Sequence, residues 1–112
     1  MNTNQVVANA INASKQAEAD YMDKYGEPFY CGFAWVEVTV GRTNSKEAKE
    51  LIAAGFRKDY KPKTLSMWNP GGSATQSMDV KEAGACAFAR VLQAAGFNAY
   101  PCSRAEIGRA HV

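Results

Sequence analysis

The side chains best suited to hold a ligand lie in two predicted strands, residues 29–40 and 64–68. Side chains alternate between the two faces of a strand, so Trp35 and Glu37 share one face of the first strand and Trp68 points outward on the second. If the strands pair, these residues share one side of a sheet, where aromatic rings can stack a base and a carboxylate can accept its hydrogen bonds. The alternative is that the N-terminal helix or a partner subunit covers this face.

Basic residues near these strands are candidates for phosphate contacts. Arg57 and Lys61 lie in the segment FRKDYKPK at residues 56–63, and Arg104 lies towards the C-terminus. Basic residues interleaved with an aromatic residue can bind phosphates or single strands. A solvated connector has the same composition, however, and Asp59 reduces its charge.

The loop at residues 69–77, NPGGSATQS, precedes a predicted helix. Glycines before a helix can present N–H groups to a phosphate, but no Gly-Lys-Ser/Thr follows and Asp79 would repel an anion. An ordinary turn is therefore favoured. The predicted ligand-binding residues are Trp35 and Trp68 for stacking, Glu37 or Asn69 for base edges, and Arg57, Lys61 and Arg104 for phosphate.

Catalytic and metal-binding patterns are sparse. The one histidine, His111, lies next to the C-terminus and is poorly anchored for a base. The cysteines Cys31, Cys86 and Cys102 have no Cys-x-x-Cys spacing, so no metal site and no cofactor is expected. If Glu37 is buried beside Trp35, its pKa is expected to be raised, which makes it the one plausible general base. A lone carboxylate is not a mechanism, so a non-enzymatic protein is expected.

Length and composition favour one small globular domain. The chain has 112 residues, of which 46% are hydrophobic and 21% charged, which argues against disorder. Thirteen basic and eleven acidic residues leave a net charge of +2, too little for a protein that coats duplex DNA. No signal peptide or apolar run of membrane-spanning length is visible, and three cysteines without a disulfide pattern suit a reducing cytosol.

Three predicted helices each combine apolar residues at helical spacing with a capping box and a following glycine. They cover residues 5–25, 45–54 and 79–95, with capping boxes at Asn2/Gln5, Asn44/Glu47 and Asp79/Glu82 and with Gly26, Gly55 and Gly96 after them. The expected inner residues are Val7, Ala10, Ile11, Ala17, Tyr21 and Tyr25 in the first helix, Ala48, Leu51 and Ile52 in the second, and Val80, Ala83, Gly84, Ala87, Phe88, Val91 and Leu92 in the third. Glu18 is assigned to the polar part of the first helix. The small residues of the third helix are expected to let it approach the sheet closely.

Alternating helices and strands predict an α+β fold, a small two-layer sandwich of a roughly three-stranded sheet with helices mainly on one face. The aliphatic face of the first strand, from Ala34 to Val40, is expected to meet the helices, and Pro101 places the last strand, 97–102, at an edge. Strand directions stay open. We expect a single domain over 1–112: an N-terminal helix at 1–26, a core at 27–104 and a flexible tail at 105–112, with the polar chain loose from Ser103.

Four segments carry a resemblance to known proteins. They are Gly-Phe-Ala-Trp-Val at 32–36, Trp-Asn-Pro at 68–70, Lys-Glu-Ala-Gly-Ala at 81–85 and a Ser-Arg-acid triplet at 103–106 with Ala105 inside it. With these segments the chain resembles a family of small conserved bacteriophage proteins. The resemblance covers about two-thirds of the chain. It implies a phage gene product acting in the cytoplasm of an infected bacterium, and implies no particular activity.

Several functions fit these observations. The leading hypothesis is a binding protein that counteracts host defence by sequestering a small anionic nucleotide signal on the residues above. The alternatives are an inhibitor that binds a host defence or metabolic protein, and a single-stranded nucleic-acid binding protein; an enzyme using Glu37 comes last. Self-association into a homo-oligomer is expected, and the long N-terminal helix is a candidate interface for it.

Overall fold

The computed structural model describes residues 2–25, 32–41, 45–59, 61–72 and 78–105. The elements in this part of the chain are helix α1 (Thr3–Tyr25), strand β1 (Gly32–Thr39), helix α2 (Lys46–Ala53), strands β2 (Arg57–Lys58) and β3 (Thr64–Trp68), helix α3 (Met78–Ala94) and strand β4 (Asn98–Ala105). The predicted α+β class and the long N-terminal helix are confirmed. None of the described helices has the length and apolar character needed to cross a membrane.

The sheet is antiparallel throughout, with strand order β2-β3-β1-β4. Helix α2 connects β1 to β2 and helix α3 connects β3 to β4, and in each case one other strand lies between the two connected strands. This is the split βαβ arrangement, here preceded by α1. The sequence predicted three strands, and β2 is the addition.

Strand β2 lies inside the segment that the sequence predicted as a connector. It contains only two residues, too few for an alternating pattern to show. Phe56, which is 2% exposed, anchors its start in the core, and the Asp59 amide donates to the Thr64 carbonyl at 3.0 Å to close the turn into β3. Strand β2 is therefore stabilised by tertiary contacts, and no local sequence pattern predicts it.

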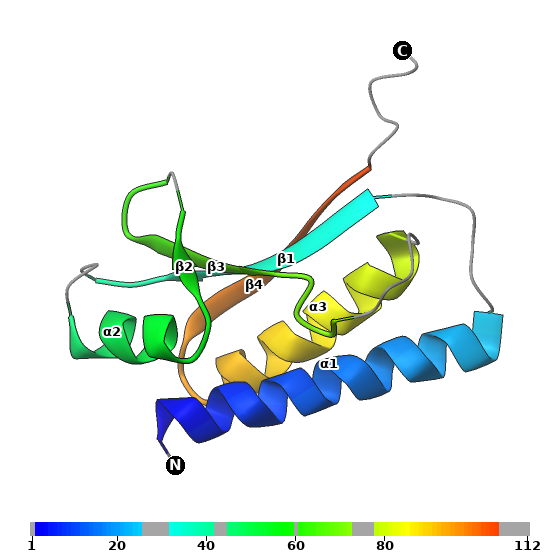
Figure 1. Cartoon of the computed structure of the whole chain (residues 1–112), viewed down its shortest axis with the longest axis horizontal. Coiled ribbons are helices and arrows are strands. Elements are labelled where there is room, and N and C mark those ends of the chain that lie inside the picture. The colour runs from blue at the N-terminus through cyan, green and yellow to red at the C-terminus, as the bar shows by residue number, and fades with distance from the viewer. Residues whose placement is uncertain (1, 26–31, 42–44, 60, 73–77, 106–112) are drawn as a thin grey trace.

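The three described helices lie on the same side of the sheet, with α1 outermost and packed mainly on α3 (Figure 1). Ala34, Val36 and Val38 of β1 are each at most 1% exposed and point into this layer, as the alternation predicted. Phe88 and Leu92 of α3 cover them and are fully buried. The opposite surface, which we call the open face, carries none of the described helices (Figure 1).

The buried stripe of α1 differs from the prediction in its second half. Its buried residues are Val6, Val7, Ala10, Ser14 and Glu18, whereas Tyr25 is 60% exposed. Ser14 and Glu18 are buried because Gly84 of α3 has no side chain to displace them. At Gly84, the close approach that a small residue of α3 allows is therefore to α1.

The helix ends agree with the predicted signals in part. The Asn2 side chain accepts from the Gln5 amide at 2.8 Å, as predicted, and Gly55 and Gly96 follow α2 and α3 with φ of +122° and +96°. The cap of α2 is Ser45, whose hydroxyl accepts from the Ala48 amide at 3.1 Å. The proposed Asn44 and Gly26 signals lie outside the described residues.

Helix α3 and strand β4 shift slightly from their predicted limits. Helix α3 begins at Met78, so Asp79 belongs to its first turn and is not its cap. Ala85 and Ala89 are buried in place of Ala83 and Ala87, a small rotation of the predicted stripe. Strand β4 is an edge strand, as predicted, but runs on to residue 105, so residues 103–105 are paired with β1 and are not loose. Residues 106–112 of the predicted tail lie outside the described chain.

Two neighbouring residues of α2 provide a test of the layer arrangement. Leu51 is fully buried, whereas Ile52, predicted to be inner, is 37% exposed. Leu51→Ala should lower the free energy of unfolding by about 2–5 kcal/mol, because it removes buried methyl groups and leaves a cavity. Ile52→Ala, the matched control, should lower the free energy of unfolding by less than about 1 kcal/mol. Urea unfolding followed by circular dichroism measures both, and equal losses would contradict this packing.

Candidate functional site

The open face brings the two tryptophans together. In the antiparallel register Trp35 of β1 lies opposite Trp68 of β3. Their ring centroids are 4.3 Å apart with an interplanar angle of 15°, a stacked pair. Trp68 is 53% exposed, so neither α1 nor another described helix covers it. The structure therefore shows the shared face that the alternation predicted, and the N-terminal helix, one of the two covers that the sequence left open, does not lie over Trp68.

Two further aromatic residues extend this surface. The Phe33 ring meets Trp68 edge-on at a centroid distance of 6.2 Å and is 39% exposed. Tyr100 of β4 lies opposite Glu37 and is 37% exposed. We call Phe33, Trp35, Trp68 and Tyr100 the aromatic platform. The predicted site omitted Phe33, although its spacing from Trp35 signals the same face, and Tyr100, whose place depends on the register of β4.

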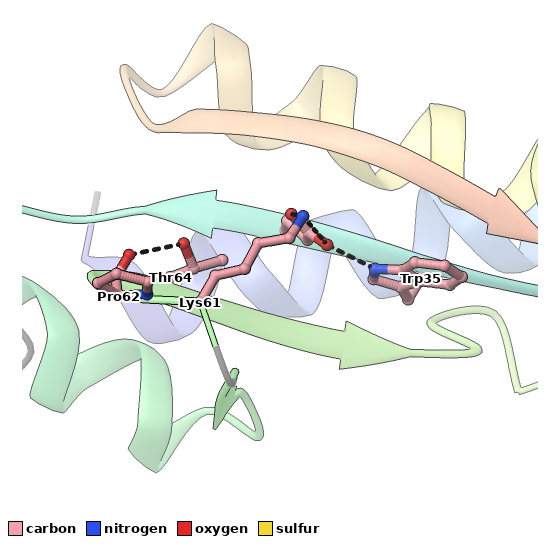
Figure 2. Close-up of polar contacts among 5 residues, drawn as sticks. Trp35, Lys61, Pro62 and Thr64 are labelled. Carbon is pink, nitrogen blue, oxygen red and sulfur yellow. Dashed lines mark hydrogen bonds and ion pairs between the residues drawn. The ribbon is translucent and has the colours of Figure 1, made fainter.

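Glu37 lies beneath the platform and is only 2% exposed. Its Oε2 accepts from Trp35 Nε1 at 2.9 Å, and Lys61 Nζ donates to Oε1 at 3.0 Å and to Oε2 at 3.3 Å. Figure 2 shows the Trp35 and Lys61 nitrogens joined by dashed lines to the carboxylate between them. Its oxygens are thus engaged within the protein, and the predicted role at base edges is not the one that the geometry favours.

The expected raised pKa of Glu37 is wrong. Burial by itself raises the pKa of this carboxyl group, but hydrogen bonds from Trp35, Lys61 and Tyr100 and the charge of Lys61 together lower it below its ordinary value. Glu37 is therefore ionised at neutral pH. A carboxylate held in this way is a weak general base, because its proton affinity is low.

Lys61 is positioned by the turn between β2 and β3. Thr64 Oγ1 donates to the Pro62 carbonyl at 3.1 Å (Figure 2), and the Val40 amide donates to the Lys63 carbonyl at 2.9 Å. These bonds hold the turn against the end of β1, from where Lys61 reaches Glu37. The predicted phosphate ligand is thus the counter-ion of the buried carboxylate.

Cys102 lies opposite Trp35 on β4 and adjoins the same carboxylate. Burial, followed by the charge and a hydrogen bond of Glu37, raises the pKa of this thiol to about 11. The thiol therefore stays protonated at neutral pH. Its surroundings make it a poor nucleophile, because the thiolate is the reactive form.

The two arginines of the predicted site flank the platform. Arg57 of β2 lies opposite Ser66, and Arg104 of β4 lies opposite Phe33; both are exposed. A groove of about 410 Å³ at the sheet edge is lined by Gly55, Arg57, Ser66, Met67 and Trp68. Within the described strands Glu37 is the only acidic residue, and Lys61 neutralises it. The described strands therefore contribute a net positive charge to the open face through Arg57 and Arg104, while Asp59, directly after β2, also acts on Cys102.

Asn69 does not join this group. It adopts φ +48° in the turn that leaves β3, where its amide donates to the Ala34 carbonyl at 3.0 Å and its carbonyl accepts from Gly72 at 2.9 Å. Its side-chain oxygen is buried. Asn69 therefore shapes the turn after Trp68, and its oxygen is not presented to a ligand on the open face.

Neither a metal-binding cluster nor a match to a known protein supports a function for this site. The described residues contain no group of three or more His, Cys, Asp or Glu side chains placed to hold a metal ion. Comparison of the chain with protein-family models, curated proteins and solved structures finds no match. The phage origin, the infected-cell location and the self-association stay predictions.

Removing Lys61 tests the charge pair. Lys61→Met should lower the free energy of unfolding at pH 7 by about 1–3 kcal/mol, because a buried carboxylate loses its cationic donor. The lowered pKa of Glu37 means that its contribution is present above the ordinary value of 4.5 and is lost as pH falls through the folded pKa. The difference between the variant and the wild type should therefore shrink in acid. Urea unfolding at several pH values measures this.

Lys58→Met is the matched control, because Lys58 is exposed on the neighbouring strand β2. Its effect should stay within about 0.5 kcal/mol and should not depend on pH. Equal effects of the two substitutions would refute the assignment of Lys61 as the counter-ion.

Proposed function

We propose that the open face binds single-stranded nucleic acid by stacking bases on the aromatic platform. The observation that carries this proposal is the stacked pair of Trp35 and Trp68 on the two central strands, with Trp68 53% exposed on the surface away from the helices. A base stacked on an aromatic ring contributes about 1–3 kcal/mol and needs no particular base identity.

The extent of the platform favours a strand of several nucleotides. Its rings come from β1, β3 and β4, and neighbouring strands are about 4.8 Å apart. Phe33 and Trp35 are two residues apart on one strand, so a second ring lies about 7 Å further along it. The platform offers more than one stacking position, and an extended ligand uses such a surface better than a single small molecule does.

The charges of the open face support the same ligand. Arg57 and Arg104 lie on opposite edge strands, on either side of the aromatic rings. A backbone that crosses the sheet can meet both guanidinium groups. The pairing of Glu37 with Lys61 removes the one carboxylate of the described strands that would repel phosphate.

The architecture supports the proposal by analogy. An RNA-recognition module also uses a four-stranded sheet whose open surface stacks two or three bases on aromatic side chains. Folds host many functions, so the argument rests on Trp68 and its surroundings and not on the topology.

A small nucleotide is the second candidate ligand. The groove of about 410 Å³ beside Trp68 joins an aromatic ring to the guanidinium of Arg57, which suits one base and one phosphate. In the infected bacterium that the resemblance implies, such binding would sequester a host nucleotide signal. Competition separates the two candidates: mononucleotides and cyclic dinucleotides displace a labelled oligonucleotide at micromolar concentrations only if the groove is the principal site.

Trp68→Ala tests the stacking surface. The affinity for a fluorescein-labelled 12-nucleotide single strand of mixed sequence should fall about 5- to 150-fold, the equivalent of about 1–3 kcal/mol. Fluorescence anisotropy at low salt measures it, with DNA and RNA versions of the strand. Tyr25→Ala is the control, because Tyr25 is 60% exposed on α1, away from the open face. An unchanged affinity in the Trp68 variant would reject the site.

The arginines are tested by salt dependence. Arg57→Ala and Arg104→Ala should each reduce the slope of log K against log salt concentration by about 0.7, as expected for one lost phosphate contact with a single strand. Arg90→Ala is the control, because Arg90 is exposed on α3, on the helical side of the sheet. A slope that both open-face variants leave unaltered would remove the arginines from the site.

A further inference from the structure

A second buried carboxyl group lies on the other side of the sheet, in the contact between α1 and α3. Glu18 of α1 is 5% exposed and Ser14, one turn earlier, is fully buried. Both polar groups belong to the face of α1 that packs on α3. Carboxyl groups are rarely buried without a partner, so this position calls for a physical account.

Two glycine backbones form the walls around the Glu18 side chain. A Cβ atom at Gly84 of α3 would lie 2.6 Å from Glu18 Oε2 and 2.8 Å from Ser14 Oγ. A Cβ atom at Gly71, in the turn after β3, would overlap the Glu18 carboxyl group. The carboxyl group therefore occupies space that any other residue at these two positions would fill, and it ties α1 to both α3 and the turn.

Neither buried oxygen has a hydrogen-bond donor among the described residues. Glu18 Oε2 and Ser14 Oγ make no hydrogen bond in the part of the chain that the structure describes. Lys81 of α3 is the charged group that acts on Glu18, but its Nζ donates to the Gly32 carbonyl at 3.4 Å and lies 5.7 Å from the Phe33 ring centroid. Of the other neighbours, Lys15 is exposed on α1, and residues 69–72 contain no charged side chain.

Burial raises the pKa of Glu18 to about 7, a rise that the charge of Lys81 only partly offsets. A raised pKa is expected for a carboxyl group that is surrounded by backbone and apolar atoms. An ionised Glu18 would place a charge at a buried oxygen that no described residue hydrogen-bonds, whereas a protonated Glu18 is neutral.

We propose that Glu18 is a proton-controlled latch that holds α1 and the turn after β3 against α3. When the carboxyl group is protonated, it is neutral and fits the space between Gly71 and Gly84. When it loses its proton, the charge draws water into the contact and weakens the docking of α1. Because α1 is the outermost helix and packs mainly on α3, it can loosen without opening the sheet (Figure 1).

The latch gives stability a defined pH dependence. The pKa of Glu18 is higher in the folded chain, about 7, than its ordinary value of 4.5, so the folded protein binds the extra proton between these values. Its stabilising effect is fully present below pH 4.5, decreases as pH rises, and is lost above about pH 7. Glu37, whose pKa is lowered, acts only below this range.

Urea unfolding between pH 4.5 and 8 tests the latch with Glu18→Gln, which is neutral at every pH and nearly the same size. The urea midpoint of the wild type relative to this variant should fall as pH rises to 7 and then level off. Groups that titrate alike in both proteins cancel in the difference. Asp20→Asn, an exposed carboxylate on the same helix, is the control and should follow the wild type. Parallel curves for the wild type and Glu18→Gln would overturn the proposal.

A direct titration keeps the test valid if Glu18→Gln folds poorly. In the wild-type protein, the ¹³C signal of the Glu18 carboxyl group and the ¹⁵N signals of Gly71 and Gly84 should titrate together, with a midpoint near 7. A Glu18 midpoint near 4.5, or glycine signals that do not follow Glu18, would reject the latch. Neither measurement involves a ligand, so the outcome is independent of nucleic-acid binding.

Discussion

The alternation of side chains along β1 is the constraint on which both sides of the molecule depend. Ala34, Val36 and Val38 are buried against the helices, so Trp35 and Glu37 must project from the open face. A shift by one residue would expose three aliphatic side chains and bury an indole and a carboxylate in their place. The hydrophobic core thereby maintains the aromatic platform, although no platform residue contributes to that core.

The two buried carboxyl groups show how local donors decide the state of a titratable group. Glu37 and Glu18 are 2% and 5% exposed, yet the pKa of the first is lowered and that of the second is raised. Burial acts in the same direction on both. The difference is that Glu37 accepts from Trp35 and Lys61, whereas Oε2 of Glu18 faces the backbone of Gly84. One carboxylate therefore orders the side chains of the open face, and the other is buried in the contact between α1 and α3.

The parts of the candidate site that follow from side-chain alternation along a strand were predictable from the sequence. The parts that depend on long-range contacts or on backbone turns were not. Period two placed Trp35 and Trp68 on one face without knowledge of the strand order, and Arg57 and Arg104 proved to flank them. The roles of Lys61 and Asn69 were not predictable in this way. Lys61 reaches Glu37 across 24 positions of sequence, and Asn69 has a left-handed backbone that turns the chain away from the platform.

The sequence by itself determined the three helices, the inner face of β1 and the outward position of each tryptophan on its own strand, because each follows from spacing within one short segment. The class of fold followed from the order of these segments along the chain. Only the tertiary structure decided that β2 is a strand, that Glu18 is inside and Ile52 outside, and which donors surround each carboxyl group. These outcomes depend on what a distant segment places beside a residue. A glycine at position 84 makes room for a carboxyl group on α1, and no pattern within α1 contains that information.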